Sequence, residues 1–163
     1  MASKRIDPAS LAPVIGTLYP APFDEPCRTR ERRKLGDAAG LTQYGVNLLT
    51  LPPGAWSSQR HWHDGSDEFV FILSGEVVLV TDAGEEILRA GEAAGFKAGD
   101  RNGHHLQNRS DKEARIIEIG TRVPSDTGTF SDVDMLAPAY QKPAVFTKKD
   151  GTPYPVMPRR GPG

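Results

Sequence analysis

Short runs of β-branched and aromatic residues, separated by single glycines, fill the middle of this 163-residue chain. Valine, isoleucine and phenylalanine dominate several of these runs, and such side chains favour strands. The runs cover residues 45–51, 67–73, 76–81, 85–89, 93–97, 104–108 and 114–120. Regularly spaced short strands with turn glycines are typical of an all-β sandwich or barrel. No segment with the helical period is long enough to compete with this interpretation.

Proline-rich segments flank the β-rich region on both sides. We expect an N-terminal arm over residues 1–40, a barrel over residues 41–122 and a C-terminal arm over residues 123–163 that packs on the barrel. Proline would confine any strand in these arms to the margin of a sheet. The first arm carries the basic run 28–34. Because Glu31 interrupts this run and no aromatic residue accompanies it, we predict a solvated arm and not a nucleic-acid contact.

The overall charge gives no reason to expect a highly charged partner. The formal net charge is −1 and the hydrophobic share is 37%, so no global field favours nucleic acid or an anionic membrane. The amino terminus lacks the apolar core of a secretory signal, and no stretch is long enough to span a bilayer. We therefore expect a cytoplasmic protein. Cys27 is the single cysteine, which excludes an internal disulfide and any thiolate cluster as a metal site.

All four histidines fall into two short clusters, His61 with His63 and His104 with His105. Side chains alternate between the faces of a strand, so His61 and His63 project from one face and can bind one ion together. Glu68 follows after a short turn and can meet them from the next strand. Neutral imidazoles and a carboxylate that converge in this way are the donors a divalent metal ion needs.

The second cluster can supply one further ligand. Neighbouring strand residues face opposite sides, so His104 and His105 cannot both enter the same cavity without a bulge. Gln59 shares the face of His61 and His63 and could bind a substrate, or it could form an ordinary hydrogen bond to a neighbouring strand. Arg60 and Lys97 could bind an anionic substrate, although lone basic residues usually lie on the surface.

The two histidine clusters lie in segments that resemble the two motifs of the cupin superfamily. The segment 54–75, GAWSSQRHWHDGSDEFVFILSG, is similar to the first motif, with one extra residue before His61. The segment 91–108, GEAAGFKAGDRNGHHLQN, is similar to the second motif. It departs from the usual pattern at Lys97, where proline is common, and its loop before the histidines is two residues longer. Counting back from Asn108 selects His104 as the ligand.

The resemblance implies a double-stranded β-helix, the cupin jelly-roll barrel, with a metal ion near one mouth. By the resemblance, His61, His63, Glu68 and His104 hold one divalent ion and leave one or two positions open, as a catalytic site requires. Such ligands fit zinc, manganese, iron, nickel or cobalt. Small single-domain cupins of this kind resemble sugar-phosphate isomerase-like proteins. We therefore expect an isomerase acting on a small polar metabolite, while an iron-dependent dioxygenase, a metal-dependent lyase and a non-catalytic ligand-binding barrel stay open.

We expect a homodimer built by sheet edges and terminal arms. Apolar side chains such as Phe130, Leu136 and Phe146 would otherwise face water. We also expect a core around Phe69, Phe71, Val78 and Ile117 or their strand neighbours. No nucleic acid or membrane partner is expected, and no side chain is assigned as the catalytic base.

Overall fold

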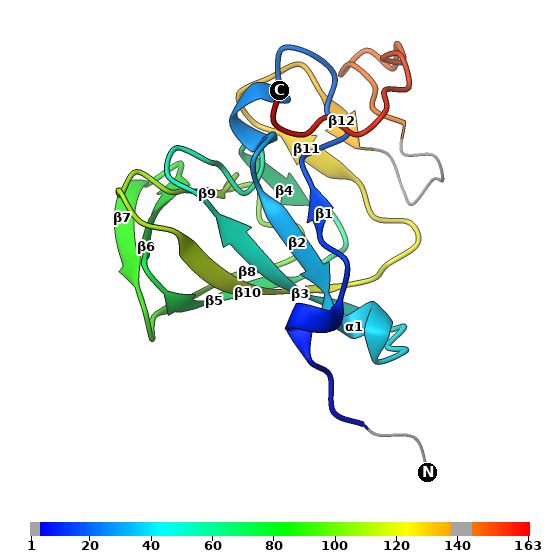
Figure 1. Ribbon diagram of the computed structural model, residues 1–163. Coiled ribbons are helices and arrows are strands. Elements are labelled where there is room, and N and C mark those ends of the chain that lie inside the picture. Colours follow the sequence, from blue (N-terminus) through cyan, green and yellow to red (C-terminus); the bar gives the residue numbers. More distant parts are fainter. Residues whose placement is uncertain (1–3, 138–144) are drawn as a thin grey trace.

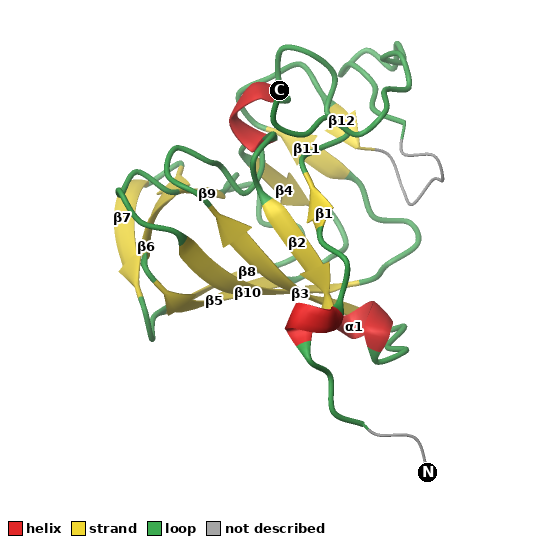
Figure 2. Cartoon of the chain, viewed as in Figure 1, coloured by secondary structure: helices red, strands yellow, loops and turns green. Residues whose placement is uncertain are grey.

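The chain folds into antiparallel strands joined by short turns, with brief helical segments (Figures 1 and 2). The computed structural model describes residues 4–137 and 145–163. Within these ranges the strands are β1 (Val14–Ile15), β2 (Glu31–Lys34), β3 (Tyr44–Leu51), β4 (His61–His63), β5 (Glu68–Ser74), β6 (Glu76–Thr81), β7 (Gly84–Arg89), β8 (Ala93–Phe96), β9 (His105–Gln107), β10 (Ala114–Thr121), β11 (Gly128–Phe130) and β12 (Leu136–Ala137). The helical segments are α1 (Leu35–Ala38) and the 3-10 turns Pro8–Ser10 and Glu25–Cys27. The expected all-β class is confirmed, and the ends of all seven predicted runs agree with a strand to within one residue.

The strands form two layers. The first layer is a six-stranded sheet in the order β1-β2-β3-β10-β5-β8. The second layer consists of two three-stranded sheets, β7-β6-β9 and β12-β11-β4. A backbone bridge between His61 and His104 connects these two sheets, and a second bridge joins Trp56, in the segment before β4, to Gln107 of β9. Two such antiparallel layers make the jelly-roll barrel, or double-stranded β-helix, that we expected.

The hydrophobic core lies between the layers and takes alternate residues of β3, β5, β6 and β10. Val70 and Ile72 of β5 are 8% and 0% exposed, whereas the adjacent Phe69 and Phe71 are 42% and 37% exposed. This alternation follows from the pleat of the strand, because Glu68 faces inward and residues two and four positions later must do the same. The core prediction was therefore right for the strand neighbours of the residues it named and wrong for those residues themselves, which are Phe69, Phe71, Val78 and Ile117.

Segments from both predicted arms are strands of these layers. β1 and β2 form one margin of the six-stranded sheet, where proline-rich segments were expected to add strands. In the second layer, β11 pairs with β4, with Gly128 opposite His63 and Phe130 opposite His61. The arms are thus built into the sheets that surround the core, and the boundaries at 40/41 and 122/123 stay a prediction.

The basic run of the first arm is not the solvated segment that we predicted. Its last four residues are β2, and β2 pairs with β3 so that Arg32 lies opposite Leu49. Leu49 is 0% exposed. Residues directly opposite each other in an antiparallel pair point to the same face, so Arg32 faces the interior of the barrel. Long-range pairing with β3 therefore turns Arg32 inward and leaves it partly buried, whereas Lys34 at the end of β2 stays exposed.

A second apolar cluster fills the space between the arms and the barrel. It contains Tyr19, Cys27, Phe130 and Met135, and Phe146 packs against it. Phe130 is 3% exposed and Leu136 is half-buried. These side chains pack within one chain, so they supply no argument for a dimer.

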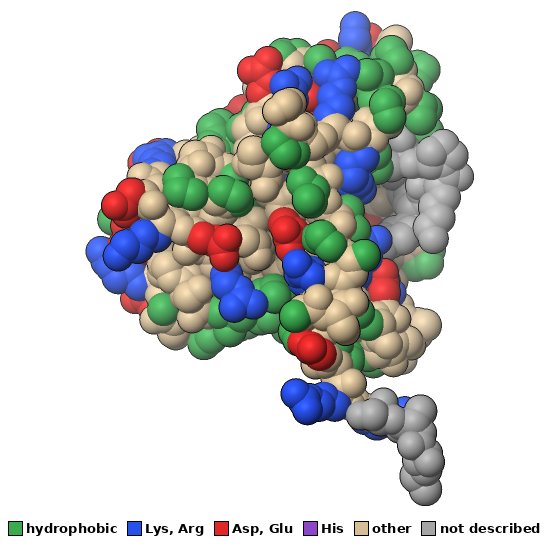
Figure 3. All heavy atoms as spheres, in the orientation of Figure 1, with side chains coloured by type: hydrophobic (Ala, Val, Ile, Leu, Met, Phe, Trp, Pro, Cys, Tyr) green, Lys and Arg blue, Asp and Glu red, His purple; other side chains and the backbone are tan. Residues whose placement is uncertain are grey.

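The homodimer itself stays a prediction. The large apolar residues that the structure does expose include three on the outer face of β5, which are Phe69, Phe71 and Leu73. Charged side chains of both signs are interspersed on the face shown in Figure 3, in keeping with the formal net charge of −1. Among the described residues no helix is both long and apolar enough to cross a membrane.

The alternation on β5 can be tested with two neighbouring substitutions. Ile72→Ala should lower the free energy of unfolding by about 2–5 kcal/mol, because it removes fully buried methyl and methylene groups and leaves a cavity. Phe71→Ala should cost less than about 1 kcal/mol, because its ring lies on the outer face and is partly in water. Urea unfolding of both variants gives the comparison. Equal losses would contradict the register of β5.

Candidate metal centre and its cavity

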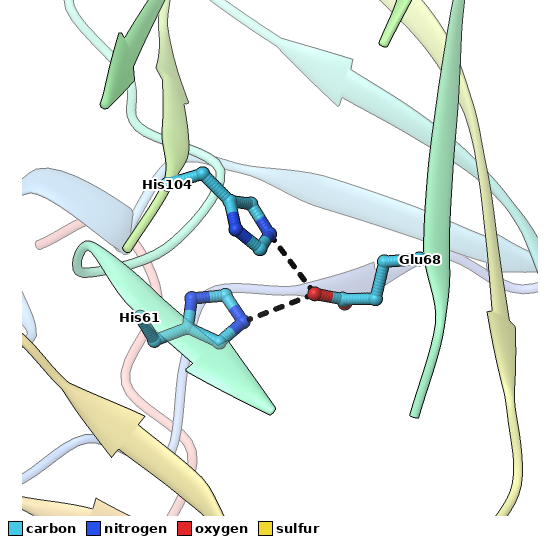
Figure 4. Close-up of side chains that lie close together, drawn as sticks. All are labelled: His61, Glu68 and His104. Carbon is cyan, nitrogen blue, oxygen red and sulfur yellow. Dashed lines mark hydrogen bonds and ion pairs between the residues drawn. The ribbon is translucent and has the colours of Figure 1, made fainter. Parts of the chain in front are cut away.

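Three imidazoles surround the carboxylate of Glu68 between the two layers. Figure 4 shows two of them, His61 and His104, on either side of the carboxylate. His61 and His63 lie on β4, Glu68 begins β5, and His104 immediately precedes β9. Oε2 of Glu68 lies 3.0 Å from Nε2 of His104 and 3.6 Å from Nε2 of both His61 and His63. Ligand atoms of His61, Glu68 and His104 all lie within 4.8 Å of one another. The structure thus brings together the four residues that the sequence selected.

Backbone pairing explains why the two histidine clusters meet. His61 and His104 form an antiparallel bridge, in which the amide of His61 donates to the carbonyl of His104 at 3.1 Å and the reverse bond measures 2.8 Å. Residues paired in this way present their side chains on the same face. His63 joins them because it lies two residues after His61 on the same strand.

Two of the imidazoles are oriented through Nδ1. Nδ1 of His61 lies 3.0 Å from the carbonyl of Gln59, and Nδ1 of His63 lies 2.6 Å from Oδ2 of Asp126. The other oxygen of Asp126 accepts the amide of Gly65 at 2.8 Å. When Nδ1 donates a proton to such acceptors, the lone pair of the neutral ring lies on Nε2, which here faces Glu68.

Asp126 was missed by sequence reasoning. It lies in the loop before β11, within the predicted C-terminal arm, 63 residues after His63. No motif or spacing in the sequence connects a lone aspartate in a loop with a histidine so far away. The pairing of β11 with β4 makes the contact.

The protonation states at this cluster suit metal ligation. Burial lowers the pKa of His61 to about 4, although the nearby carboxylate of Glu68 opposes the shift. Burial by itself would raise the pKa of Glu68, but the hydrogen bond with His104 and the interactions with the three imidazoles outweigh it and hold the pKa at about 2. At neutral pH His61 is therefore neutral and Glu68 is ionised, which are the forms that bind metal.

His104 provides a further observation on the fit of the site. Its ring stacks on Phe96 at 3.5 Å with an interplanar angle of 1°. Nδ1 of His104 is buried and has no hydrogen-bond partner within the described part of the chain, so Nε2 is the ring atom that contacts another group. His61, Glu68 and His104 place two imidazole nitrogens and a carboxylate oxygen within 4.8 Å of one another, and Nε2 of His63 lies 3.6 Å from the same carboxylate. Nitrogen and oxygen donors of this kind suit a divalent ion. The residues present fit such an ion.

His105 occupies a different environment. Nδ1 lies 2.9 Å from the carbonyl of Ser58, and Nε2 lies 2.9 Å from the side-chain nitrogen of Gln107. The ring also packs edge-on against Trp56. Both nitrogens of His105 are thus engaged by protein groups, and His104 is the histidine placed beside Glu68.

Two further candidate side chains are engaged elsewhere. The side-chain nitrogen of Gln59 donates to the carbonyl of Phe23 at 2.8 Å, which is the ordinary hydrogen bond that the sequence left open. Gln59 is not among the residues that line the cavities beside the cluster, and its contact with a substrate stays a prediction. Arg60 forms ion pairs with Asp82 and Asp132.

Two cavities meet at the cluster. The larger has a volume of about 750 Å³ and the smaller about 340 Å³. Glu68, Phe96 and His104 line both of them. Beside Glu68 on the inner face of the first sheet lie Gly120 and Gly45, which are paired across β5, β10 and β3. Because glycine has no side chain, this row leaves room for the larger cavity next to the carboxylate.

The chain belongs to the cupin superfamily. The family model described as a cupin domain matches residues 47–120, which include the histidine cluster and Glu68. A crystal structure from Silicibacter pomeroyi, described as a sugar phosphate isomerase from a cupin superfamily, is 44% identical in sequence with a TM-score of 0.88. The match covers 92% of this chain and 96% of that chain.

Two other relatives come from Streptomyces. The tetracenomycin polyketide synthase protein TcmJ of Streptomyces glaucescens is 29% identical over 80 residues, which are 49% of this chain and 52% of that protein. This chain thus matches about half the length of TcmJ. The polyketide cyclase RemF of Streptomyces resistomycificus has a TM-score of 0.60 at 20% identity and covers 74% of this chain and 80% of that chain. At that identity the likeness to RemF shows the fold alone.

The lowered pKa of His61 predicts an acid-sensitive metal-free protein. The unfolded state binds a proton at His61 below pH 6.5 and the folded state only below about pH 4, so the folded state loses stability as pH falls between these values. Between pH 7.5 and 5, His61 should account for about 2 kcal/mol of the loss. Urea unfolding of chelator-treated protein measures this loss. In His61→Gln the loss should shrink by that amount, and an unchanged loss would contradict the assignment.

The contact between Asp126 and His63 predicts a role in metal affinity. Asp126→Asn should weaken metal binding about 10- to 100-fold, because the amide no longer fixes the proton on Nδ1 as a carboxylate does. Asp150→Asn, in an exposed turn far along the chain, is the matched control and should leave affinity unchanged. Competition with a colourimetric chelator gives both values. Equal affinity in the two variants would rule out the positioning role.

Proposed function

We propose that this protein is a metal-dependent isomerase that acts on a small anionic metabolite of the sugar-phosphate type. The observation that carries the proposal is the convergence of three imidazoles on Glu68. Glu68 and two of these imidazoles, His61 and His104, line a cavity of about 750 Å³. A cavity of this size suits a small metabolite. The 44% identity to the Silicibacter pomeroyi protein over 92% of this chain supports this choice of reaction.

His61, His63, Glu68 and His104 are the residues that would hold the ion. A divalent ion supplies a Lewis acid that polarises a substrate carbonyl. Sugar-phosphate isomerisation moves a proton between neighbouring carbons, so it needs this polarisation and a base but no net oxidation. Metal analysis therefore separates the proposal from the iron-dependent dioxygenase and the non-catalytic barrel, and turnover separates it from a metal-dependent lyase.

The chain's own residues prepare the site for this reaction. Gln59 and Asp126 hold the rings of His61 and His63 with Nε2 toward Glu68. Phe96 covers one face of the His104 ring, which limits the water that can reach it. Gly45 and Gly120 keep the space beside Glu68 free for a substrate.

Metal content and turnover of protein purified without a histidine tag test the proposal. Bound zinc or manganese, together with interconversion of aldose and ketose phosphates, would support it. Bound iron with substrate-dependent oxygen uptake would identify a dioxygenase instead. Protein that takes up no metal from a divalent-ion mixture would indicate a non-catalytic binding barrel.

The two adjacent histidines provide a sharp internal comparison. His104→Ala should lose stoichiometric metal, because it removes a nitrogen 3.0 Å from Glu68, as should His61→Ala and His63→Ala. His105→Ala should keep its metal, because both nitrogens of His105 contact protein groups outside the cluster. Elemental analysis with circular dichroism, which checks the fold, measures this. Metal retained in His104→Ala and lost in His105→Ala would reverse the assignment.

A further inference from the structure

The larger cavity has a basic wall that comes from the first arm. Arg30, Arg32 and Lys34 all line it, together with His61, Glu68 and His104. The alternate residues Glu31 and Arg33 pair with each other at 2.9 Å. Side chains alternate along an extended chain, so Arg30, Arg32 and Lys34 face the cavity and the residues between them face away from it.

Two of these three cations already have carboxylate partners. Arg32 donates to both oxygens of Glu118, from Nε at 2.7 Å and from Nη2 at 2.8 Å. Lys34 lies 3.8 Å from Asp37, and both side chains are largely in solvent. The charge of Arg32 is thus balanced inside the cavity, and that of Lys34 is screened by water.

Arg30 has no such partner. It is 7% exposed and forms no ion pair with a carboxylate of the described residues. Nε donates to the carbonyl of Gly16 at 3.2 Å, Nη1 donates to the carbonyl of Ser57, and the guanidinium lies 5.3 Å from the centre of the Tyr19 ring. These neutral contacts fix its position without neutralising its charge. A buried guanidinium without a counter-ion is costly, so an anion that enters the cavity relieves that cost.

The basic wall and the histidine cluster are linked through two adjacent residues. Arg30 and Arg32 both donate to the carbonyl of Ser57. The hydroxyl of the next residue, Ser58, lies 3.3 Å from Nδ1 of His61. Consecutive Cα atoms are ~3.8 Å apart. Arg30 and His61 also line the same cavity, so one ligand inside it can contact both groups.

We propose that Arg30 is the oxyanion receptor of this cavity and binds the phosphate or carboxylate group of the substrate, while the rest of the substrate extends toward His61, Glu68 and His104. The placement of the reacting end of the substrate beside the histidine cluster rests on the function proposed above. The planar guanidinium matches the geometry of phosphate and carboxylate oxygens. Glu118 limits the strength of the site, because it pairs with the guanidinium of Arg32 in the same cavity.

Calorimetric titration of metal-free protein with inorganic phosphate, and separately with acetate, tests the receptor without the metal. Wild type should bind at least one of the two anions, with an affinity that falls as salt is added. Tighter binding of phosphate would point to a phosphate ester, and tighter binding of acetate to a carboxylate. No binding of either anion by the folded wild type would overturn the proposal.

Paired variants locate the site. Arg30→Gln should weaken binding at least tenfold, and Arg30→Lys should recover part of the loss. Glu118→Gln leaves Arg30 in place and releases Arg32, so it should tighten binding about three- to tenfold. Arg109→Gln changes an exposed arginine paired with Glu85 and is the matched control for charge. Unchanged binding in Arg30→Gln, or weaker binding in folded Glu118→Gln, would contradict the assignment.

The receptor and the proposed function can fail separately. His61→Ala should lose metal and keep the phosphate or acetate affinity of wild type, because Arg30 lies outside the cluster. Loss of anion binding in folded His61→Ala would place the anion at the histidines and overturn the role of Arg30. A wild-type protein that binds the anion through Arg30 but takes up no metal would refute the metal-dependent isomerase and leave the receptor standing.

Discussion

The contacts of the Glu68 carboxylate with three imidazoles join the two layers of the barrel. The carboxylate projects from the six-stranded sheet, and the imidazoles come from the opposite layer. Once Glu68 faces inward, the period of two along a strand also turns Val70 and Ile72 inward, and they become part of the core. The register of β5 thus serves both the candidate metal centre and the packing beneath it.

The inner face of the first sheet changes character along its strands. At the level of Glu68 it carries Gly45 and Gly120, so it is open. Further along, Leu49, Ile72 and Ile116 close it with buried aliphatic side chains. One end of the barrel is therefore hollow and polar and the other is solid and apolar, which lets a buried core coexist with a cavity large enough for a ligand.

The two arms complete the cavity. The first arm adds β2 to the sheet and brings Arg30 and Arg32 to the wall, while the loop before β11 brings Asp126 to His63. The candidate metal ligands and the basic wall thus come from parts of the chain that are far apart in sequence. A domain reduced to residues 41–122 would keep the four donors and lose both Asp126 and the basic wall.

The sequence by itself determined the all-β class, the seven glycine-bounded strands and the candidate donors His61, His63, Glu68 and His104, because hydrophobic period, turn glycines and motif spacing are local properties of a chain. If Glu68 faces inward, Val70 and Ile72 must face inward too, and this could have been read from the sequence. We instead expected Phe69 and Phe71 in the core because they are large aromatic residues. Tertiary structure alone decided the burial of Arg30, the contact of Asp126 with His63 and the intramolecular packing of Phe130. Each of these features depends on pairing between strands that are distant in the sequence. The stability of such pairing comes from contacts between the strands, which the local sequence does not encode.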